Sequence, residues 1–371
     1  MKVGIPKEIH PGAARVAATP DTVKKFNAKG LDVLVEKSAG IGSHFTDEAY
    51  LEAGAEMVDT AAALGADIVL KVHQPTHDEI SKMKKGAILV SFLELCHDDG
   101  TLRKLAEVGV DAFALSMIPR ISRAQTMDAL SSQSNIAGYR AALEATTLYG
   151  RFMPMMMTSA GSAKPAKVCV LGAGVAGLQA IATARRLGAQ VYGYDIRPEV
   201  KEQVLSLGAR FIEFDLGESG EGSGGYAKQL SEEAQKKEKS LLTEELKKMD
   251  IIISTALVPC MAAPTLITEE AVKGMHQGSV IIDMAAATGG NCPLTEADKT
   301  VIKHGVIICG ITNFPELMPS DASSFYARNL FNFLSLLLEE QDGQIKLKDY
   351  FEDEITASSL VTHESKVRFE L

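Results

Sequence analysis

Several features that would restrict the function are missing from this chain. Its longest nearly apolar run, residues 330–338, is interrupted by Asn332 and Ser335 and is too short to cross a bilayer, which takes ~20 residues. The formal net charge is −10 and the basic residues form no stripe, which argues against nucleic acid as a partner. The five cysteines include no CxxC pair, so no metal site is expected. The first eight residues are too charged for a signal peptide.

What the chain does contain is typical of a globular protein. It has 371 residues, of which 46% are hydrophobic and 23% charged. This length allows two domains, each with its own core.

A complete strand–turn–helix–strand unit dominates the middle of the sequence. A GxGxxG spacing alone would be weak support for a nucleotide site, but here the flanking elements agree with it. The unit consists of a strand at 168–171, the glycines Gly172, Gly174 and Gly177, a helix at 180–187, a second strand at 190–194, and then Asp195.

Each of these positions has a physical role in binding a dinucleotide. Gly172 permits a tight turn, Gly174 lets the backbone approach a pyrophosphate, and Gly177 lets the helix pack on the sheet. Asp195 is placed to accept hydrogen bonds from an adenosine ribose and to repel a 2′-phosphate, which favours NAD over NADP. Arg197 leaves this preference open, because an arginine can pair with such a phosphate.

The first third of the chain alternates strand-like and helical patterns, which predicts a parallel sheet with helices on both faces. This part carries no GxGxxG. The predicted strands are 3–5, 32–35, 67–72, 87–93 and 111–117, and the predicted helices lie near 20–29, 46–53, 77–84 and 98–108.

Residues 119–140 break this pattern with a dense set of polar side chains. The set comprises Arg120, Arg123, Gln125, Asp128 and Ser131. At a domain junction such density suggests a loop that faces a ligand, although a solvated linker with a capped helix explains the composition equally well.

The remaining segments complete a second domain and return to the first. A helix is predicted from Ser131 to about Arg151, and the methionine-rich excursion at 155–165 is interpreted as a packing or dimer surface. The glycine-rich stretch 217–225 predicts a loop, and Tyr226 at its end could close over a ligand or be incidental. A long apolar helix from Ser320 to near Glu340 is expected to return to the first domain.

Six stretches resemble the NAD(H)-binding component of proton-translocating NAD(P) transhydrogenases, the alpha subunit or its N-terminal portion. Alanine dehydrogenase is the near relative of this family. The stretches are Gly-Ile-Pro-Lys-Glu at 4–8 with Arg-Val-Ala-Ala-Thr-Pro at 15–20, the junction segment 119–140, the glycine fingerprint, Gly-Gly-Tyr-Ala-Lys at 224–228, and Gly-Gly-Asn-Cys-Pro at 289–293.

The resemblance implies two doubly wound parallel-sheet, Rossmann-like α/β domains, with the first discontinuous. It would comprise residues 1–130 and 306–371, and residues 131–305 would carry the NAD site. The residues implied around the dihydronicotinamide, as the catalytic set, are Arg120, Gln125, Asp128 and Ser131, with Thr126 and Met127 beside them. Those implied along the rest of the cofactor are Gly172, Gly174, Val175, Ala176, Gly177, Asp195, Ile196, Arg197, Gly225, Tyr226 and Leu257.

The implied reaction is hydride transfer from NADH on this chain to NADP⁺ on a partner subunit, coupled to proton translocation. Such a transfer needs oriented rings and no general acid or base, so Gln125 would position the ring while Arg120 and Asp128 hold each other. The implied partners are a second copy of this chain through the 155–165 hairpin, an NADP(H)-binding beta-subunit domain, and a membrane-spanning proton-channel subunit. The implied location is the cytoplasmic face of a membrane, or the matrix side in mitochondria.

Two other functions remain open at this stage. Arg15 and Lys71 occupy positions where alanine dehydrogenase binds its substrate, but that family's histidine and acidic residue align with Glu94 and Ala287. Lys71 is then interpreted as a structural or surface residue. The second alternative is a non-catalytic NAD-binding protein. The role of Glu238, at a position that is commonly glutamine in the family, is left open.

Overall fold

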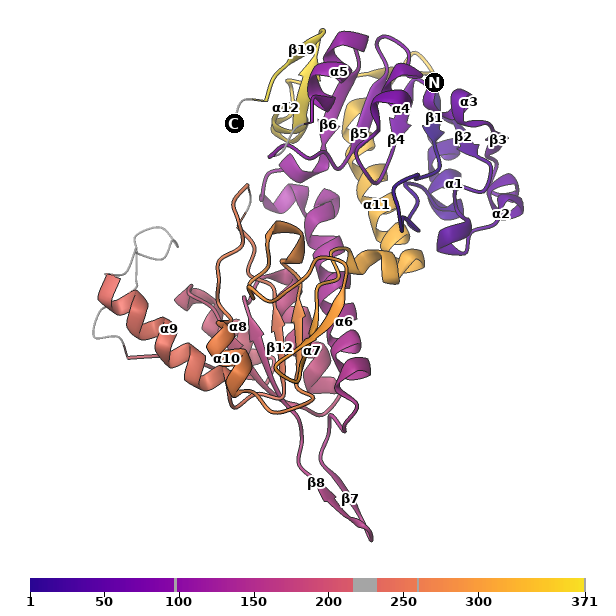
Figure 1. The fold of residues 1–371 in the computed structure, drawn as a ribbon. Coiled ribbons are helices and arrows are strands. Elements are labelled where there is room, and N and C mark those ends of the chain that lie inside the picture. The colour runs from indigo at the N-terminus through magenta and orange to yellow at the C-terminus, as the bar shows by residue number, and fades with distance from the viewer. Residues whose placement is uncertain (97–98, 216–231, 259, 370–371) are drawn as a thin grey trace. The chain divides into compact units, whose positions relative to one another are not determined.

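The computed structural model describes residues 1–96, 99–215, 232–258 and 260–369 (Figure 1). The chain forms two compact units, one made of Met1–Gln133 with Pro315–Leu371 and the other of Ser134–Phe314. The first unit is therefore discontinuous. The domain boundaries expected from the sequence, 130/131 and 305/306, lie within ten residues of those of the two units.

A mainly parallel sheet forms the centre of the first unit. Its strands follow the order β19-β18-β6-β5-β4-β1-β2-β3. Strand β18 runs antiparallel to β6, and the edge strand β19 runs antiparallel to β18, so the sheet is not wholly parallel. The bounds are β1 Lys2–Ile5, β2 Asp32–Glu36, β3 Glu56–Val58, β4 Ile68–Leu70, β5 Ile88–Ser91, β6 Asp111–Ala114, β18 Leu360–His363 and β19 Lys366–Val367.

Helices cover both faces of this sheet, as the alternating pattern predicts. One apolar cluster joins the sheet to α1, α11 and α12, and another joins its opposite face to α3, α4 and α5. Thr19, Thr46, Asp59 and Thr76 each accept a backbone N–H as an N-cap, which explains where four of the helices begin. The bounds are α1 Pro20–Ala28, α2 Asp47–Glu52, α3 Thr60–Leu64, α4 His77–Ser81, α5 Thr101–Val108, α11 Pro319–Leu337 and α12 Glu354–Ser359.

The second unit contains another sheet, in the order β11-β10-β9-β12-β13-β15-β14, which is parallel except for the pair β14 and β15. Helices α6, α7 and α8 pack on one face, and α9 and α10 pack on the other. The strand bounds are β9 Lys167–Leu171, β10 Gln190–Tyr194, β11 Arg210–Phe211, β12 Ile251–Ser254, β13 Val280–Asp283, β14 Thr300–Lys303 and β15 Val306–Cys309. The helix bounds are α6 Ala129–Tyr149, α7 Val175–Arg186, α8 Lys201–Ser206, α9 Glu232–Leu246 and α10 Glu269–Gly274.

Two small hairpins complete the secondary structure. The methionine-rich excursion is an antiparallel pair, β7 Met156–Thr158 and β8 Gly161–Ala163, and Figure 1 shows it projecting from the second unit. In the first unit, β16 Leu338–Gln341 pairs with β17 Gln344–Leu347. Among the described residues, no helix combines the length and apolar character that a bilayer crossing requires.

Candidate functional site

The glycine turn after β9 has the geometry that its spacing predicts. Gly172 has a φ of +89°, and its N–H donates to the Tyr194 carbonyl at 2.8 Å. A Cβ at Gly177 would lie 1.8 Å from the Gly172 carbonyl oxygen, so only glycine lets α7 pack this closely. Among the described residues, a Cβ placed at Gly174 would meet nothing within 4 Å. The backbone at Gly174 therefore borders open space, where a ligand could approach it.

The amino end of α7 follows this open position. Gly174 is its N-cap and supplies no side-chain acceptor to the first turn. Free N–H groups at a helix start attract anions, and a phosphate is the usual occupant after such a turn. Val175 is 42% exposed at this end, whereas Ala176 is half-buried. The turn can thus bind a pyrophosphate through backbone groups.

Asp195 lies at the carboxyl end of β10, and its carboxylate already accepts hydrogen bonds from neighbouring residues. It accepts hydrogen bonds from the Ala173 N–H at 2.7 Å and from the Arg197 side chain, with Nε and Nη2 both at 3.0 Å. Burial raises the pKa of this carboxyl, but the bonds from Arg197 and Ala173 outweigh burial, and the pKa lies below its usual value. Asp195 is therefore a fixed carboxylate beside the glycine turn.

Apolar side chains flank this edge of the second sheet. Ile196 is 62% exposed, and Leu257, which follows β12, is 51% exposed. Thr255 joins that strand end to the turn, because its Oγ1 donates to the Gly172 carbonyl at 3.0 Å. Exposed apolar groups beside a nucleotide site can pack on a base or a ring.

The junction segment forms a 3₁₀ turn, Ser122–Met127, that is anchored within the first unit. Arg123 makes a bidentate pair with Asp353, at 2.6 and 2.9 Å. Asn329 and Asn332 of α11 both donate to the Thr126 carbonyl. These bonds hold the turn in a defined conformation, so it is not a loose linker.

The predicted residues in this turn and just before it have different exposures. The side chains of Arg120, Gln125 and Thr126 are exposed, while that of Met127 is buried in the core of the first unit. The Met127 side chain is therefore not available to a ligand.

Asp128 caps α6 and does not pair with Arg120. Its carboxylate accepts the Ser131 N–H at 2.8 Å and the Ser131 hydroxyl at 2.5 Å. The expectation that Arg120 and Asp128 hold each other is therefore wrong, because the nearby helix start uses both carboxylate oxygens. In the part of the chain that the structure describes, Arg120 forms no ion pair.

Two predicted residues, Gly225 and Tyr226, lie outside the described residues. Glu238 on α9 is described, and its carboxylate accepts the Tyr194 hydroxyl at 2.7 Å. Through this bond, Glu238 supports the end of β10, the strand that Asp195 follows. Among the described residues, His, Cys, Asp and Glu side chains nowhere gather in a group of three or more that could hold a metal ion.

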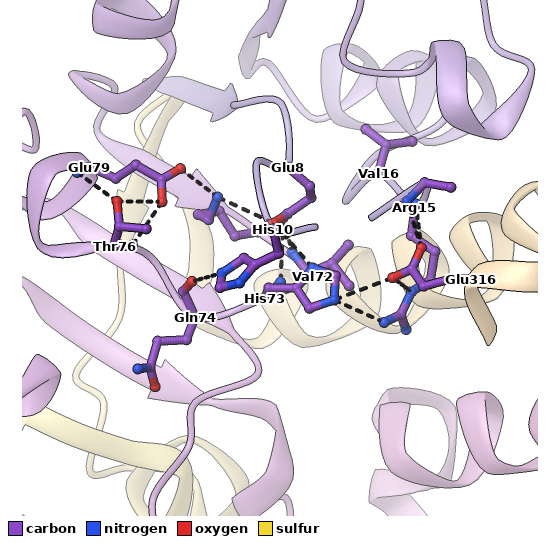
Figure 2. A network of polar contacts seen from close by, with 12 residues as sticks. Glu8, His10, Arg15, Val16, Val72, His73, Gln74, Thr76, Glu79 and Glu316 are labelled. Atoms are coloured by element: carbon purple, nitrogen blue, oxygen red, sulfur yellow. Dashed lines mark hydrogen bonds and ion pairs between the residues drawn. The ribbon is translucent and has the colours of Figure 1, made fainter. Parts of the chain in front are cut away.

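A buried polar network lies in the first unit, at the carboxyl ends of β1 and β4 (Figure 2). Lys71 is fully buried and pairs with Glu79 at 2.7 Å and Glu8 at 3.3 Å. The interpretation of Lys71 as a surface residue is therefore wrong, while a structural role agrees with these two ion pairs.

Arg15 forms the other end of this network. Its Nε donates to Glu316 Oε1 at 2.7 Å and its Nη1 to Gln133 Oε1 at 2.8 Å. His73 lies between the two ends, with Nδ1 at 3.3 Å from Glu8 and Nε2 at 3.3 Å from Glu316 (Figure 2). Both basic groups that could bind a substrate carboxylate are thus occupied by carboxylates of the chain itself.

Burial and pairing shift the ionisation of this network in opposite directions. Burial lowers the pKa of His73, but hydrogen bonds to Glu316 and Glu8 outweigh it, so the pKa is raised. Burial raises the pKa of Glu316, but His73 and Arg15 together bring it down to about 2.

The doubly wound sheet, the glycine turn and the acidic residue after the second strand define a dinucleotide-binding α/β protein. Comparison with known proteins identifies the family. Residues 4–137 match the family described as "Alanine dehydrogenase/PNT, N-terminal domain", and residues 141–370 match "Alanine dehydrogenase/PNT, C-terminal domain". The chain belongs to the alanine dehydrogenase/PNT family, which is a family of oxidoreductases.

Similar individual proteins include members of both branches of this family. The chain is 48% identical to the first portion of NAD(P) transhydrogenase subunit alpha from Rhodospirillum rubrum, covering 99% of this chain and 97% of that protein. It is 40% identical to a transhydrogenase structure from Sinorhizobium meliloti, with a TM-score of 0.87 and 99% of each chain covered. An L-alanine dehydrogenase structure is 27% identical, with a TM-score of 0.83 over 99% of this chain and 97% of that one. The predicted family and fold class are thus confirmed.

Sequence reasoning missed one residue that organises the nucleotide edge of the second unit. Asn291 lies in the Gly-Gly-Asn stretch, which the sequence singles out only through its resemblance to the family. Its side chain binds the backbone of Ala256 and Pro264. An asparagine after two glycines signals a turn, but nothing local to it indicates these distant partners.

Proposed function

We propose that the chain is the NAD(H)-binding component of a proton-translocating NAD(P) transhydrogenase. The observation that carries this proposal is the intact glycine turn with Asp195 beside it, in a chain 48% identical to a transhydrogenase alpha subunit over nearly its whole length. Both NAD binding and catalysis of hydride transfer are included in the proposal.

The cofactor proposed for this site is NAD(H). Backbone N–H groups at Gly174, Val175 and Ala176 would hold the pyrophosphate, with Gly172 and Gly177 shaping the turn. The Asp195 carboxylate would accept the ribose hydroxyls. Its pair with Arg197 supports NAD over NADP, because the guanidinium that could receive a 2′-phosphate is already used.

The proposed role of the junction turn is to orient the nicotinamide. Gln125 and Thr126 present exposed side chains from an anchored backbone, as does Arg120. Asp128 and Ser131 fix the start of α6, which follows this turn. Bound NADH would supply the hydride, and these side chains would hold the ring in place and exclude water. The proposed contacts of Ile196 and Leu257 with the cofactor are apolar, and Gly225 and Tyr226 remain proposed members of the site.

The proposed partners follow from the same family. NADP(H) would be bound by a beta-subunit domain, and proton passage would belong to a membrane-spanning subunit. This chain would then be peripheral to the membrane, on its cytoplasmic or matrix face. A second copy of the chain would pair through the hairpin of β7 and β8.

Alanine dehydrogenase activity is the second candidate, and the first unit argues against it. Oxidation of an amino acid requires a cation for its carboxylate and an acid–base group. Arg15 is paired with Glu316 and Lys71 with two glutamates, so neither cation is open to a substrate. A third candidate is a non-catalytic NAD-binding protein.

A reconstitution experiment distinguishes these three functions. The purified chain is mixed with an NADP(H)-binding transhydrogenase component, and NADH-dependent reduction of an NADP⁺ analogue is followed by absorbance. Reduction that requires both proteins supports the proposal. Binding of NADH without any transfer favours the non-catalytic protein, and pyruvate formation from alanine and NAD⁺ favours the dehydrogenase.

A further inference from the structure

Asn291 is fully buried in the second unit, and every polar group it has is in use. Its backbone N–H donates to Asp283 Oδ1 at 3.1 Å, and its carbonyl accepts the N–H groups of Leu266 and Ile267, both at 3.0 Å. Its side-chain Oδ1 accepts the Ser254 hydroxyl at 2.6 Å. A buried amide with all of its bonds formed has one orientation, so Asn291 acts as a rigid connector.

The amide nitrogen of Asn291 reaches the chain that follows β12. Nδ2 donates to the carbonyl of Ala256 and to that of Pro264, each at 2.8 Å. These two carbonyls lie on either side of the exposed Leu257 in the sequence. The amide therefore clamps both ends of the segment that carries this cofactor-site candidate.

The loop that carries Asn291 is bonded to the end of the neighbouring strand β13. Asp283, at the end of β13, is fully buried and accepts the N–H groups of Asn291 and Cys292 and the hydroxyl of Thr295. The loop of Gly289 to Thr295 is thus tied to the sheet and cannot shift without breaking these bonds.

The residue before Ala256 connects this segment to the glycine turn. Thr255 precedes the clamped Ala256, and its N–H donates to the Leu171 carbonyl at 2.8 Å. Its hydroxyl donates to the Gly172 carbonyl at 3.0 Å. Hydrogen bonds therefore join Asp283 to Asn291, Asn291 to Ala256, and Thr255, the residue bonded covalently to Ala256, to Gly172, so the ends of β13, β12 and β9 are connected.

We infer that Asn291 is a positioning residue for the nucleotide site, which holds the backbone after β12 at the distance from the glycine turn that an adenine dinucleotide requires. This inference rests on the proposed function, since it assigns a ligand to the same site. Only asparagine supplies two donors and one acceptor at this reach, because aspartate lacks the donors and glutamine is one methylene longer.

Asn291→Asp tests the inference. The substituted oxygen faces the carbonyls of Ala256 and Pro264 and repels them, so the clamped segment is released. We expect the dissociation constant for NADH to rise about tenfold, because binding must then order the released segment. It is measured by NADH fluorescence on the full-length chain, well below the melting temperature.

Asn27→Asp is the matched control. In the first unit, Asn27 Nδ2 also donates to two backbone carbonyls, those of Ala53 and Gly54, at 3.1 and 3.0 Å. This variant loses the same pair of bonds and should lower the melting temperature without changing NADH affinity. A purely structural role for Asn291 would give that same result for Asn291→Asp.

The outcomes separate this inference from the function on which it rests. If the wild-type chain does not bind NADH, the proposed function fails. If it binds NADH and Asn291→Asp binds equally well, only the positioning role is overturned. Should Asn291→Asp not fold, Ser254→Ala decides: it removes the hydroxyl that donates to Asn291 Oδ1, so the amide is held only through its bonds to Ala256 and Pro264. A rise of about two- to threefold in the dissociation constant supports the role and an unchanged value overturns it.

Discussion

At the scale of single residues, Asp195 offers the sharpest test of cofactor choice. Its carboxylate lies beside the glycine turn, where the hydroxyls of an adenosine ribose would bind and a 2′-phosphate would be repelled. Asp195→Ala removes this repulsion and frees Arg197 to pair with the phosphate. We expect the ratio of the NADPH to the NADH dissociation constant to fall by about tenfold or more, measured by fluorescence titration.

Arg197→Met is the control for this experiment. It keeps the carboxylate and removes the guanidinium, so the preference for NADH should remain. An unchanged ratio in Asp195→Ala would mean that another group discriminates between the two cofactors.

Local residues of the site could be predicted from the sequence, and distant partners could not. Gly172, Gly177 and Asp195 belong to one continuous stretch whose spacing determines their contacts. Asn291 acts on Ala256 and Pro264, which lie 35 and 27 residues away in the sequence. The pairing of Arg120 with Asp128 failed for a different reason, since the carboxylate accepts the Ser131 N–H and hydroxyl at the adjacent start of α6.

At the scale of elements, most of the patterned segments were predictable, and three short pieces were not. The strands β1, β2 and β5 and helices α1 and α6 were placed to within a few residues. The elements β3, α3 and α12 were missed. Each is a six-residue or shorter piece without a full hydrophobic period, and its form depends on packing against the sheet.

The hairpin of β7 and β8 carries the element-scale prediction. Met155 is 64% exposed and Met157 is 78% exposed, and an isolated two-stranded hairpin has little stability in water. A hollow of about 490 Å³ at its base, lined in part by Phe152 and Lys164, could receive apolar side chains. We therefore expect a second copy of the chain to pack on the exposed methionines of this hairpin.

The double variant Met155→Gln and Met157→Gln should weaken this association. Replacing two buried methionines at an interface by glutamine is expected to raise the dimer dissociation constant by about 100-fold, measured by analytical ultracentrifugation. Ile302→Gln, at an equally exposed apolar position on β14, should leave the dimer intact. A double variant as dimeric as the wild type would contradict the role of the hairpin.

At the scale of the whole molecule, the polar network of the first unit joins stretches of the chain that are far apart in sequence. Arg15 bonds to Gln133 near the end of one chain segment and to Glu316 near the start of the other. The two segments of the discontinuous unit are thus joined by buried charges. Removing one partner would leave the other buried and unpaired, and such changes cost about 3–5 kcal/mol.

His73 makes this network sensitive to pH. Its pKa is raised in the folded chain, so protonation stabilises the fold fully below the ordinary histidine pKa of about 6.5, and the stabilisation is lost as pH rises through the folded value. Glu316 behaves in the opposite sense. Its pKa of about 2 gives a contribution that is present above the usual glutamate value and lost as pH falls towards 2.

The resulting prediction concerns the alkaline side, where His73 acts and the carboxylates no longer titrate. The free energy of unfolding should fall between pH 6 and pH 9, and His73→Gln should show a smaller fall because glutamine bonds to Glu8 and Glu316 without a proton to lose. His304→Gln is the matched control for replacing a histidine by glutamine, since His304 belongs to the other unit and pairs with Glu269 on its surface. Urea unfolding at each pH measures the difference, and equal slopes for the wild type and His73→Gln would show that the proton on His73 does not stabilise the two-segment unit.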